Sequence, residues 1–152
     1  MKYSKLIGII LIVCIAFTFL AVVSAYEVTV CGDQFNIPYG FEKDDAYSTV
    51  SKTAMGTQEN AVFTNGIDII YIGVSVMNNG GVVLPTGDNY TDKTVNGVSG
   101  KYYEDDTGIG FIYIHGNKCI TISFPNDSNS TFEEIVIKPP EDDSGSPFNL
   151  FG

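Results

Sequence analysis

The sequence predicts a mainly β protein: a single antiparallel sheet or a small sandwich with one or two short helices, preceded by an N-terminal hydrophobic helix. Short runs of alternating apolar and polar residues recur between Tyr26 and Phe124, and this period of two is typical of strands buried on one face. Turn pairs that contain glycine separate these runs. After residue 25, helix is expected only around residues 46–54 and over residues 132–137, so an α+β architecture is the alternative.

The first 25 residues have the pattern of a secretory signal peptide. Lys2 and Lys5 precede an apolar run over residues 6–24, and the small residues Ser24 and Ala25 end it, which predicts cleavage after Ala25. The run is close to the roughly 20 residues that cross a bilayer, so an uncleaved transmembrane anchor is the alternative. With either outcome the lysines stay on the cytoplasmic side. We therefore expect a secreted or cell-surface protein, or one anchored in the plasma membrane with its body outside.

The remainder predicts one extracytoplasmic β-rich domain over residues 26–138 and a disordered acidic tail over residues 139–152. The chain carries 18 acidic side chains against 8 basic ones, a net charge of −10. Such a charge repels phosphate backbones and anionic headgroups. We expect no nucleic-acid partner, and membrane contact only through residues 6–24 if they are retained.

The first part of the domain predicts a hairpin followed by a polar stretch. Alternation over residues 26–37, with a Gly32-Asp33 turn, is typical of a hairpin. Residues 42–60 are polar and rich in Ser and Thr, with at most one or two weak helical turns around residues 46–54. Asn65-Gly66 predicts a second hairpin turn.

The second part predicts the core of the sheet. Residues 67–77 are apolar on one face and partly apolar on the other, as in a central strand, and a loop over residues 78–93 follows. Residues 95–104, 109–115 and 119–124 predict a three-stranded meander. Residues 132–137 predict a short capped helix or, because of three β-branched residues in succession, a last strand.

Two cysteines lie beyond the apolar run, Cys31 and Cys119. An even pair outside the cell predicts a disulfide bond, provided that the two Cα atoms come within about 7 Å. Two reduced thiols are the alternative.

Three Asn-x-Ser/Thr sequons occur in predicted loops, at Asn89, Asn126 and Asn129. In an exported protein they are candidate glycosylation sites. Chance occurrence in a chain rich in Asn, Ser and Thr is the alternative.

The sequence contains no recognisable catalytic, cofactor-binding or transition-metal motif. His115 is the only histidine and ends a predicted strand, without a second ligand at metal-binding spacing. Among the acidic clusters, the turn Glu104–Gly108 is the best candidate for calcium, although a solvated turn is the preferred explanation. Tyrosines could line a face for sugar or protein binding: Tyr90, Tyr102, Tyr103 and Tyr113.

Three segments carry a family resemblance: Phe35–Phe41, Gly100–Tyr103 and the Gly116–Lys118 turn. Together they resemble small exported proteins of methanogenic archaea that have no assigned activity. The first segment is also similar to the entry strand of Mog1/PsbP-like sandwiches, which implies a single antiparallel sheet flanked by helices. Neither resemblance implies catalytic residues.

These observations favour a non-enzymatic binding or interaction module, exported or at the cell surface, with a protein or glycan partner. A small extracellular hydrolase is one alternative, and it predicts a pocket in which His115 or Cys119 meets an acidic residue. A calcium-stabilised structural module is the other.

Overall fold

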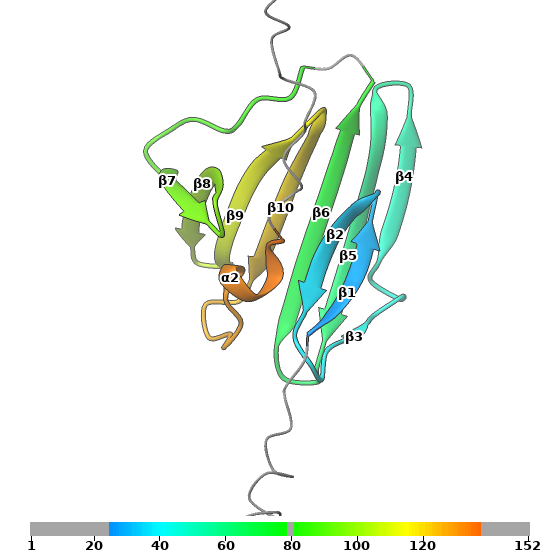
Figure 1. Cartoon of the computed structure of the whole chain (residues 1–152), viewed down its shortest axis with the longest axis vertical. Helices are drawn as coiled ribbons and strands as arrows, with labels where there is room; N and C mark the ends of the chain where they lie inside the picture. The colour runs from blue at the N-terminus through cyan, green and yellow to red at the C-terminus, as the bar shows by residue number, and fades with distance from the viewer. Residues whose placement is uncertain (1–24, 79–80, 138–152) are drawn as a thin grey trace, which may run out of the picture.

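The computed structural model describes residues 25–78 and 81–137, which form a mainly β body (Figure 1). The predictions for residues 1–24 and 139–152, the signal peptide or anchor and the acidic tail, lie outside the described residues. Within the described part of the chain, no helix is both long and apolar enough to cross a membrane. The elements in chain order are β1 Tyr26–Val30, β2 Asp33–Ile37, β3 Glu42–Lys43, β4 Thr49–Thr53, β5 Gly56–Thr64, β6 Ile69–Met77, β7 Thr91–Val95, β8 Val98–Asp105, β9 Gly108–His115, β10 Lys118–Phe124 and α2 Phe132–Ile135.

One antiparallel sheet of eight strands dominates the body. Its order is β3-β5-β6-β10-β9-β8-β7, and β4 pairs with the same edge of β5 as β3 does. The prediction of a central strand is confirmed, because β6 pairs with β5 on one side and with β10 on the other. The predicted meander is confirmed in β8, β9 and β10.

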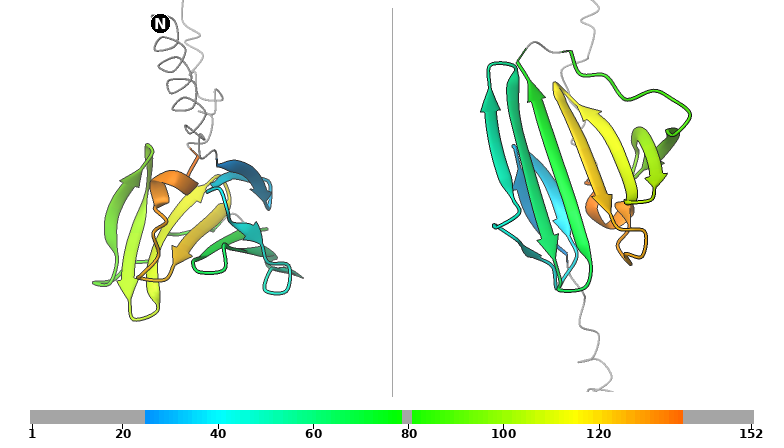
Figure 2. Two further views of the ribbon diagram at one scale, coloured as in Figure 1. Left: turned by 90° about the horizontal axis from the view of Figure 1, so that it is seen from below. Right: turned by 180° about the vertical axis from the view of Figure 1, so that it is seen from behind.

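The hairpin β1-β2 and the short helix α2 cover one face of this sheet (Figure 2). Phe35 and Ile37 of β2 and Ile135 of α2 are fully buried, and a single β-bridge joins Phe35 to Val136. Beneath them lie the inward side chains of the sheet, which complete the core: Phe63, Ile70, Ile72, Val74, Phe111, Ile120, Ile122 and Phe124.

The opposite face of the sheet is not covered by any described element (Figure 2, right). Alternation along β6 shows the difference, because Ile70 and Ile72 are buried whereas Tyr71 between them is 45% exposed. Antiparallel sheets commonly bury one face and solvate the other. We call the uncovered side of β4, β5, β6, β10 and β9 the open face.

The helical turns predicted around residues 46–54 are wrong, because this region forms a turn and then strand β4. All five residues of β4 are exposed, since it is an edge strand with no element on either face. Such a strand buries no face and so shows no alternation of apolar residues. Its backbone still pairs with β5, and polar residues such as Ser and Thr are compatible with that pairing.

Two turns differ from the predicted ones. The β1-β2 turn is Cys31-Gly32, with φ of 49° and 85°, one residue earlier than predicted. Residues 95–104 are two strands, because Asn96-Gly97 adopts φ of 50° and 81° and forms a hairpin turn between β7 and β8. Positive φ at both central residues matches the twist of antiparallel strands, which is why Asn-Gly pairs favour such turns.

Both predictions for residues 132–137 hold in part. Phe132–Ile135 is helical, and Val136 then bridges to β2 as an extended residue. Glu134 Oε2 accepts a hydrogen bond from the Thr131 backbone N–H at 3.0 Å, the capping contact that starts short helices.

Candidate functional site

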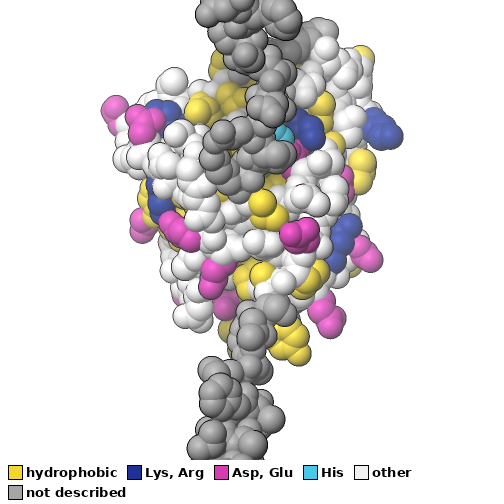
Figure 3. Space-filling view, in the orientation of Figure 1, with side chains coloured by type: hydrophobic (Ala, Val, Ile, Leu, Met, Phe, Trp, Pro, Cys, Tyr) yellow, Lys and Arg dark blue, Asp and Glu magenta, His cyan; other side chains and the backbone are white. Residues whose placement is uncertain are grey.

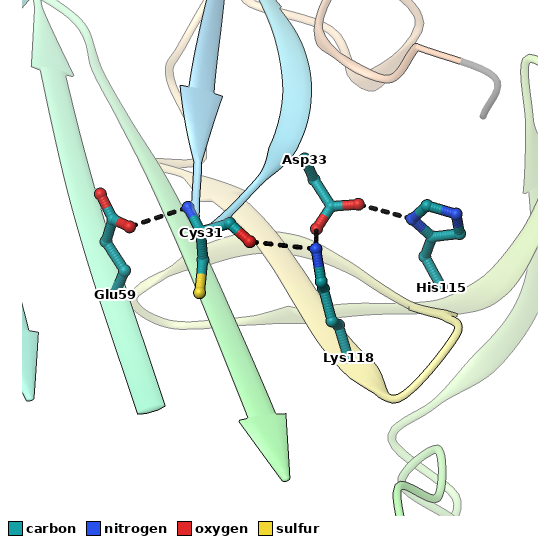
Figure 4. Close-up of polar contacts among 5 residues, drawn as sticks. All are labelled: Cys31, Asp33, Glu59, His115 and Lys118. Carbon is teal, nitrogen blue, oxygen red and sulfur yellow. Dashed lines mark hydrogen bonds and ion pairs between the residues drawn. The ribbon is translucent and has the colours of Figure 1, made fainter. Parts of the chain in front are cut away.

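The first candidate is a polar cluster where the β1-β2 hairpin meets the sheet (Figure 4). Asp33 opens β2, and its side chain is only 7% exposed. Its Oδ1 lies 2.5 Å from His115 Nδ1 and its Oδ2 lies 2.7 Å from Lys118 Nζ. A carboxylate removed from water in this way needs strong partners, and charge-assisted hydrogen bonds supply them.

The same cluster holds the tip of the hairpin. Lys118 Nζ also donates to the Cys31 carbonyl oxygen at 3.0 Å, and the Cys31 backbone N–H donates to Glu59 Oε2 at 2.8 Å (Figure 4). Strands β5 and β10 of the sheet thereby contact the two-residue turn, and β9 contacts Asp33 next to it. The hairpin makes no backbone ladder with the large sheet, so these polar contacts and the apolar packing of β2 in the core fix its position.

The Asp33 charge also acts on the core beside it. Burial raises the pKa of the Tyr113 phenol far above its usual range, and the negative charge of Asp33 adds to the effect. Tyr113 is 2% exposed, so its ring serves packing and is not part of a ligand-binding face.

His115 and Asp33 resemble the base and orienting acid of a hydrolase in their contact alone. Lys118 shares the carboxylate, and in the described residues no Ser, Thr or Cys side chain hydrogen-bonds to the His115 ring. Nor do the described ranges contain a group of three or more His, Cys, Asp or Glu side chains that could hold a metal ion. The contacts of the cluster tie the tip of the hairpin to the sheet, and we call it the hairpin clamp. Sequence reasoning missed it because Asp33 and Lys118 lie 85 residues apart.

The predicted disulfide bond between Cys31 and Cys119 is not formed in this structure, where both thiols are free. Cys31 belongs to the hairpin turn on the covered face, whereas Cys119 lies on β10 and points to the open face. The sheet itself separates the two side chains. Burial raises the pKa of the Cys119 thiol.

The turn proposed for calcium uses its carboxylate internally. Asp105 Oδ1 accepts hydrogen bonds from the Thr107 hydroxyl at 2.6 Å, the Thr107 N–H at 2.8 Å and the Gly108 N–H at 3.2 Å. These bonds, first the one from the hydroxyl, lower the pKa of Asp105. This is an Asx turn, which explains the acidic residue without a metal ion.

All three sequon asparagines are exposed. They differ in one respect: Asn126 Nδ2, the atom to which a glycan would attach, donates to the Asp105 carbonyl oxygen at 2.9 Å. Glycosylation replaces one of the two Nδ2 hydrogens, so this bond survives only through the other one. Asn89 and Asn129 stay predicted acceptor sites.

The second candidate is the centre of the open face, where strand register aligns uncharged side chains in lateral rows. Gly73 lies opposite both Asn60 and Thr121, and Ser75 lies opposite both Gln58 and Cys119. A third row follows at Tyr71. Strand by strand, the rows are Ser51-Gln58-Ser75-Cys119, Thr49-Asn60-Gly73-Thr121 and Val62-Tyr71-Ser123.

A hollow of about 270 Å³ lies over β5, β6 and β10 in these rows. Its lining is polar but carries no charged side chain, although the chain as a whole has a net charge of −10. Over the covered face, acidic side chains are dispersed among uncharged ones (Figure 3). The hollow is therefore chemically distinct from the average surface.

The tyrosines singled out in the sequence do not share one face. Tyr113 is in the core, and Tyr102 packs edge-on against Phe132 under the helix at 6.2 Å between ring centroids. Tyr90 and Tyr103 form an edge-on pair at 5.9 Å. The tyrosine in the hollow is Tyr71. Sequence reasoning counted it as an apolar residue on the second face of residues 67–77. Its hydroxyl and the polar Ser75 on the same face are the signal in the sequence that this reasoning missed.

Comparison of the chain with protein-family models, with curated proteins and with solved structures finds no match. The resemblances noted in the sequence therefore stay predictions.

Proposed function

We propose that this chain is an exported, non-enzymatic binding module that acts at the cell surface and binds its partner through the open face of the sheet. The observation that carries the proposal is the uncharged polar hollow over β5, β6 and β10. The core needs only the opposite face of these strands, so the composition of the open face is free to serve binding.

The connection to the rest of the chain supports this use of the open face. The described body begins at β1 and ends just after α2, and both elements lie on the covered face (Figure 2). Segments before residue 25 and after residue 137 therefore join on the side opposite the hollow. A body held at a surface through either end presents its open face outward.

The hydrolase alternative has less support. Its requirement that His115 meet an acidic residue is satisfied by Asp33, but the same carboxylate binds Lys118. In the described part of the chain no Ser, Thr or Cys side chain is bonded to the His115 ring as an activated nucleophile would be.

The test is binding of the purified full chain to cell envelopes of its host, measured by co-sedimentation. Thr121→Lys places a long charged side chain in the hollow, and Thr29→Lys makes the same change on exposed β1 of the covered face. We expect Thr121→Lys to abolish binding and Thr29→Lys to preserve it, with unchanged melting temperatures for both. Equal binding by both variants, or turnover of ester, peptide or glycoside substrates that is lost in His115→Ala, contradicts the proposal.

A further inference from the structure

We infer that the ligand of the open face is an uncharged glycan, with a sugar ring stacked on Tyr71 and its hydroxyls bonded in the hollow beside it; this inference rests on the proposed function. Gly73 makes the floor of the hollow. A Cβ built on this residue would meet Asn60 Oδ1 at 3.1 Å, so the absence of a side chain leaves the backbone of β6 open between Asn60 and Thr121.

The size of the hollow suits one or two sugar rings. It crosses three strands, about 10 Å, and three alternate residues along β6, about 13 Å. A specific protein interface needs roughly 800 Å² on each partner and an apolar centre. No aliphatic side chain lines the hollow itself. The apolar residues Ile112 and Ile114 flank it on β9, and Val50 and Met55 lie at the β4 edge.

The polar groups around the floor match sugar hydroxyls, which both donate and accept hydrogen bonds. Amide and hydroxyl side chains combine both roles. Asn60 Nδ2 donates to Thr49 Oγ1 at 3.2 Å, and Gln58 Nε2 donates to Asn60 Oδ1 at 3.3 Å. These bonds orient the two amides before a ligand arrives, which lowers the entropy cost of binding.

Charge selects among polar ligands. None of the side chains that line the hollow is charged, whereas the protein around it is strongly anionic. An anionic polymer is repelled by that net charge, and a cationic ligand finds no carboxylate in the hollow. An uncharged polymer of hydroxyl groups is the partner that this surface fits. The ring of Tyr71, 45% exposed, adds an amphipathic platform beside the polar floor.

The test is affinity electrophoresis of the full chain, kept in a polyoxyethylene detergent that contains no sugar. The neutral probes are a soluble β-glucan, a mannan and a galactan, and the charged probes are heparin and polygalacturonate. We expect retardation by at least one neutral probe only. Tyr71→Ala is expected to weaken that binding about tenfold, Tyr71→Phe to retain it, and Tyr39→Ala, at a 73% exposed tyrosine outside the hollow, to leave it unchanged.

Thiol protection gives a second readout that does not depend on a substitution. Cys119 lines the hollow and Cys31 lies on the covered face, so a bound glycan is expected to slow alkylation of Cys119 while Cys31 reacts at its usual rate. Peptide mass spectrometry distinguishes the two sites. Retardation by a neutral probe without protection of Cys119, or retardation by none of the neutral probes, overturns the inference.

Periodate treatment of the host envelopes separates failure of this inference from failure of the proposed function. Envelope binding that is lost in Thr121→Lys but survives periodate oxidation of the sugars contradicts a glycan ligand and supports a protein partner on the same face. Envelope binding that does not respond to Thr121→Lys contradicts the proposed function itself.

Discussion

The hairpin clamp predicts a large difference between two lysines that have similar surroundings. The side chains of Lys118 and Lys101 are both 22% exposed, and their Nζ atoms lie 2.7 Å and 2.8 Å from a carboxylate oxygen. The carboxylates differ: Asp33 is 7% exposed and Asp92 is 89% exposed. The substitutions Lys118→Met and Lys101→Met each remove the charge and keep an apolar side chain of similar length.

We expect Lys118→Met to lower the free energy of unfolding by about 2–3 kcal/mol. Removing one partner of a fully buried pair costs about 3–5 kcal/mol. The value here is smaller because His115 still contacts Asp33 and the lysine is partly exposed to solvent. For Lys101→Met the expected loss is at most about 1 kcal/mol, as for surface ion pairs in general.

Equilibrium unfolding in urea measures the difference. With a slope of about 1–3 kcal/mol per molar urea, the midpoint of Lys118→Met should fall by roughly 1 M or more, and that of Lys101→Met by a few tenths. Equal midpoints for the two variants refute the reasoning, because Lys118 differs from Lys101 in the burial of its carboxylate partner and in its bond to the Cys31 carbonyl oxygen.

Three further predictions concern the core and the turns. Folding keeps the Tyr113 phenol protonated, so the contribution of Tyr113 to stability is complete below about pH 10 and declines at higher pH, where the phenol ionises in the unfolded chain. Urea midpoints should therefore fall less between pH 9 and pH 11 in Tyr113→Phe than in the wild type. Gly100→Ala should lower the free energy of unfolding by at least about 1–3 kcal/mol, because the new Cβ would lie 2.3 Å from the Ile112 carbonyl oxygen. Gly81→Ala is the control, since its Cβ would meet nothing within 4 Å. Similar melting temperatures for the two variants contradict the prediction. Asn96 Nδ2 donates to the Glu133 and Val136 carbonyl oxygens at 2.7 and 2.9 Å. Asn96→Gly removes both bonds but tolerates the positive φ, so it should lower the free energy of unfolding by about 1–2 kcal/mol. An unchanged urea midpoint contradicts a stabilising role for these two bonds.

Local signals were sufficient for the strands and for some of the turns. Alternation of apolar and polar residues identified β1, β2, β9 and β10, because a strand buried on one face places every second side chain in the core. Asn96-Gly97 carries the same signal as Asn65-Gly66 but was absorbed into one predicted strand. Edge strand β4 could not be recognised, since an exposed strand has no buried face to produce alternation.

The two candidate sites depend on tertiary structure, which local patterns do not contain. Asp33 meets His115 across 82 residues of sequence, and nothing near either residue specifies the other. The hollow requires knowing which face of the sheet the hairpin covers. The sequence indicates two faces on β6, but only the docking of β1-β2 and α2 decides that Tyr71, Gly73 and Ser75 remain accessible.

The order of the strands also has a consequence for how the chain folds. Apart from the pair β6–β10, strands β3 to β6 pair among themselves and strands β7 to β10 do the same, so each half can form from its own turns. The two halves meet at one seam, β6 with β10, where Val74 pairs with Ile120. Within the sheet, closing that seam is the least local pairing, because the connection after β6 and strands β7 to β9 lie between its two strands in the sequence. It is therefore the natural slow step in forming the sheet. Lengthening this connection should therefore slow folding, while doubling its length costs only about 0.6 kcal/mol at equilibrium.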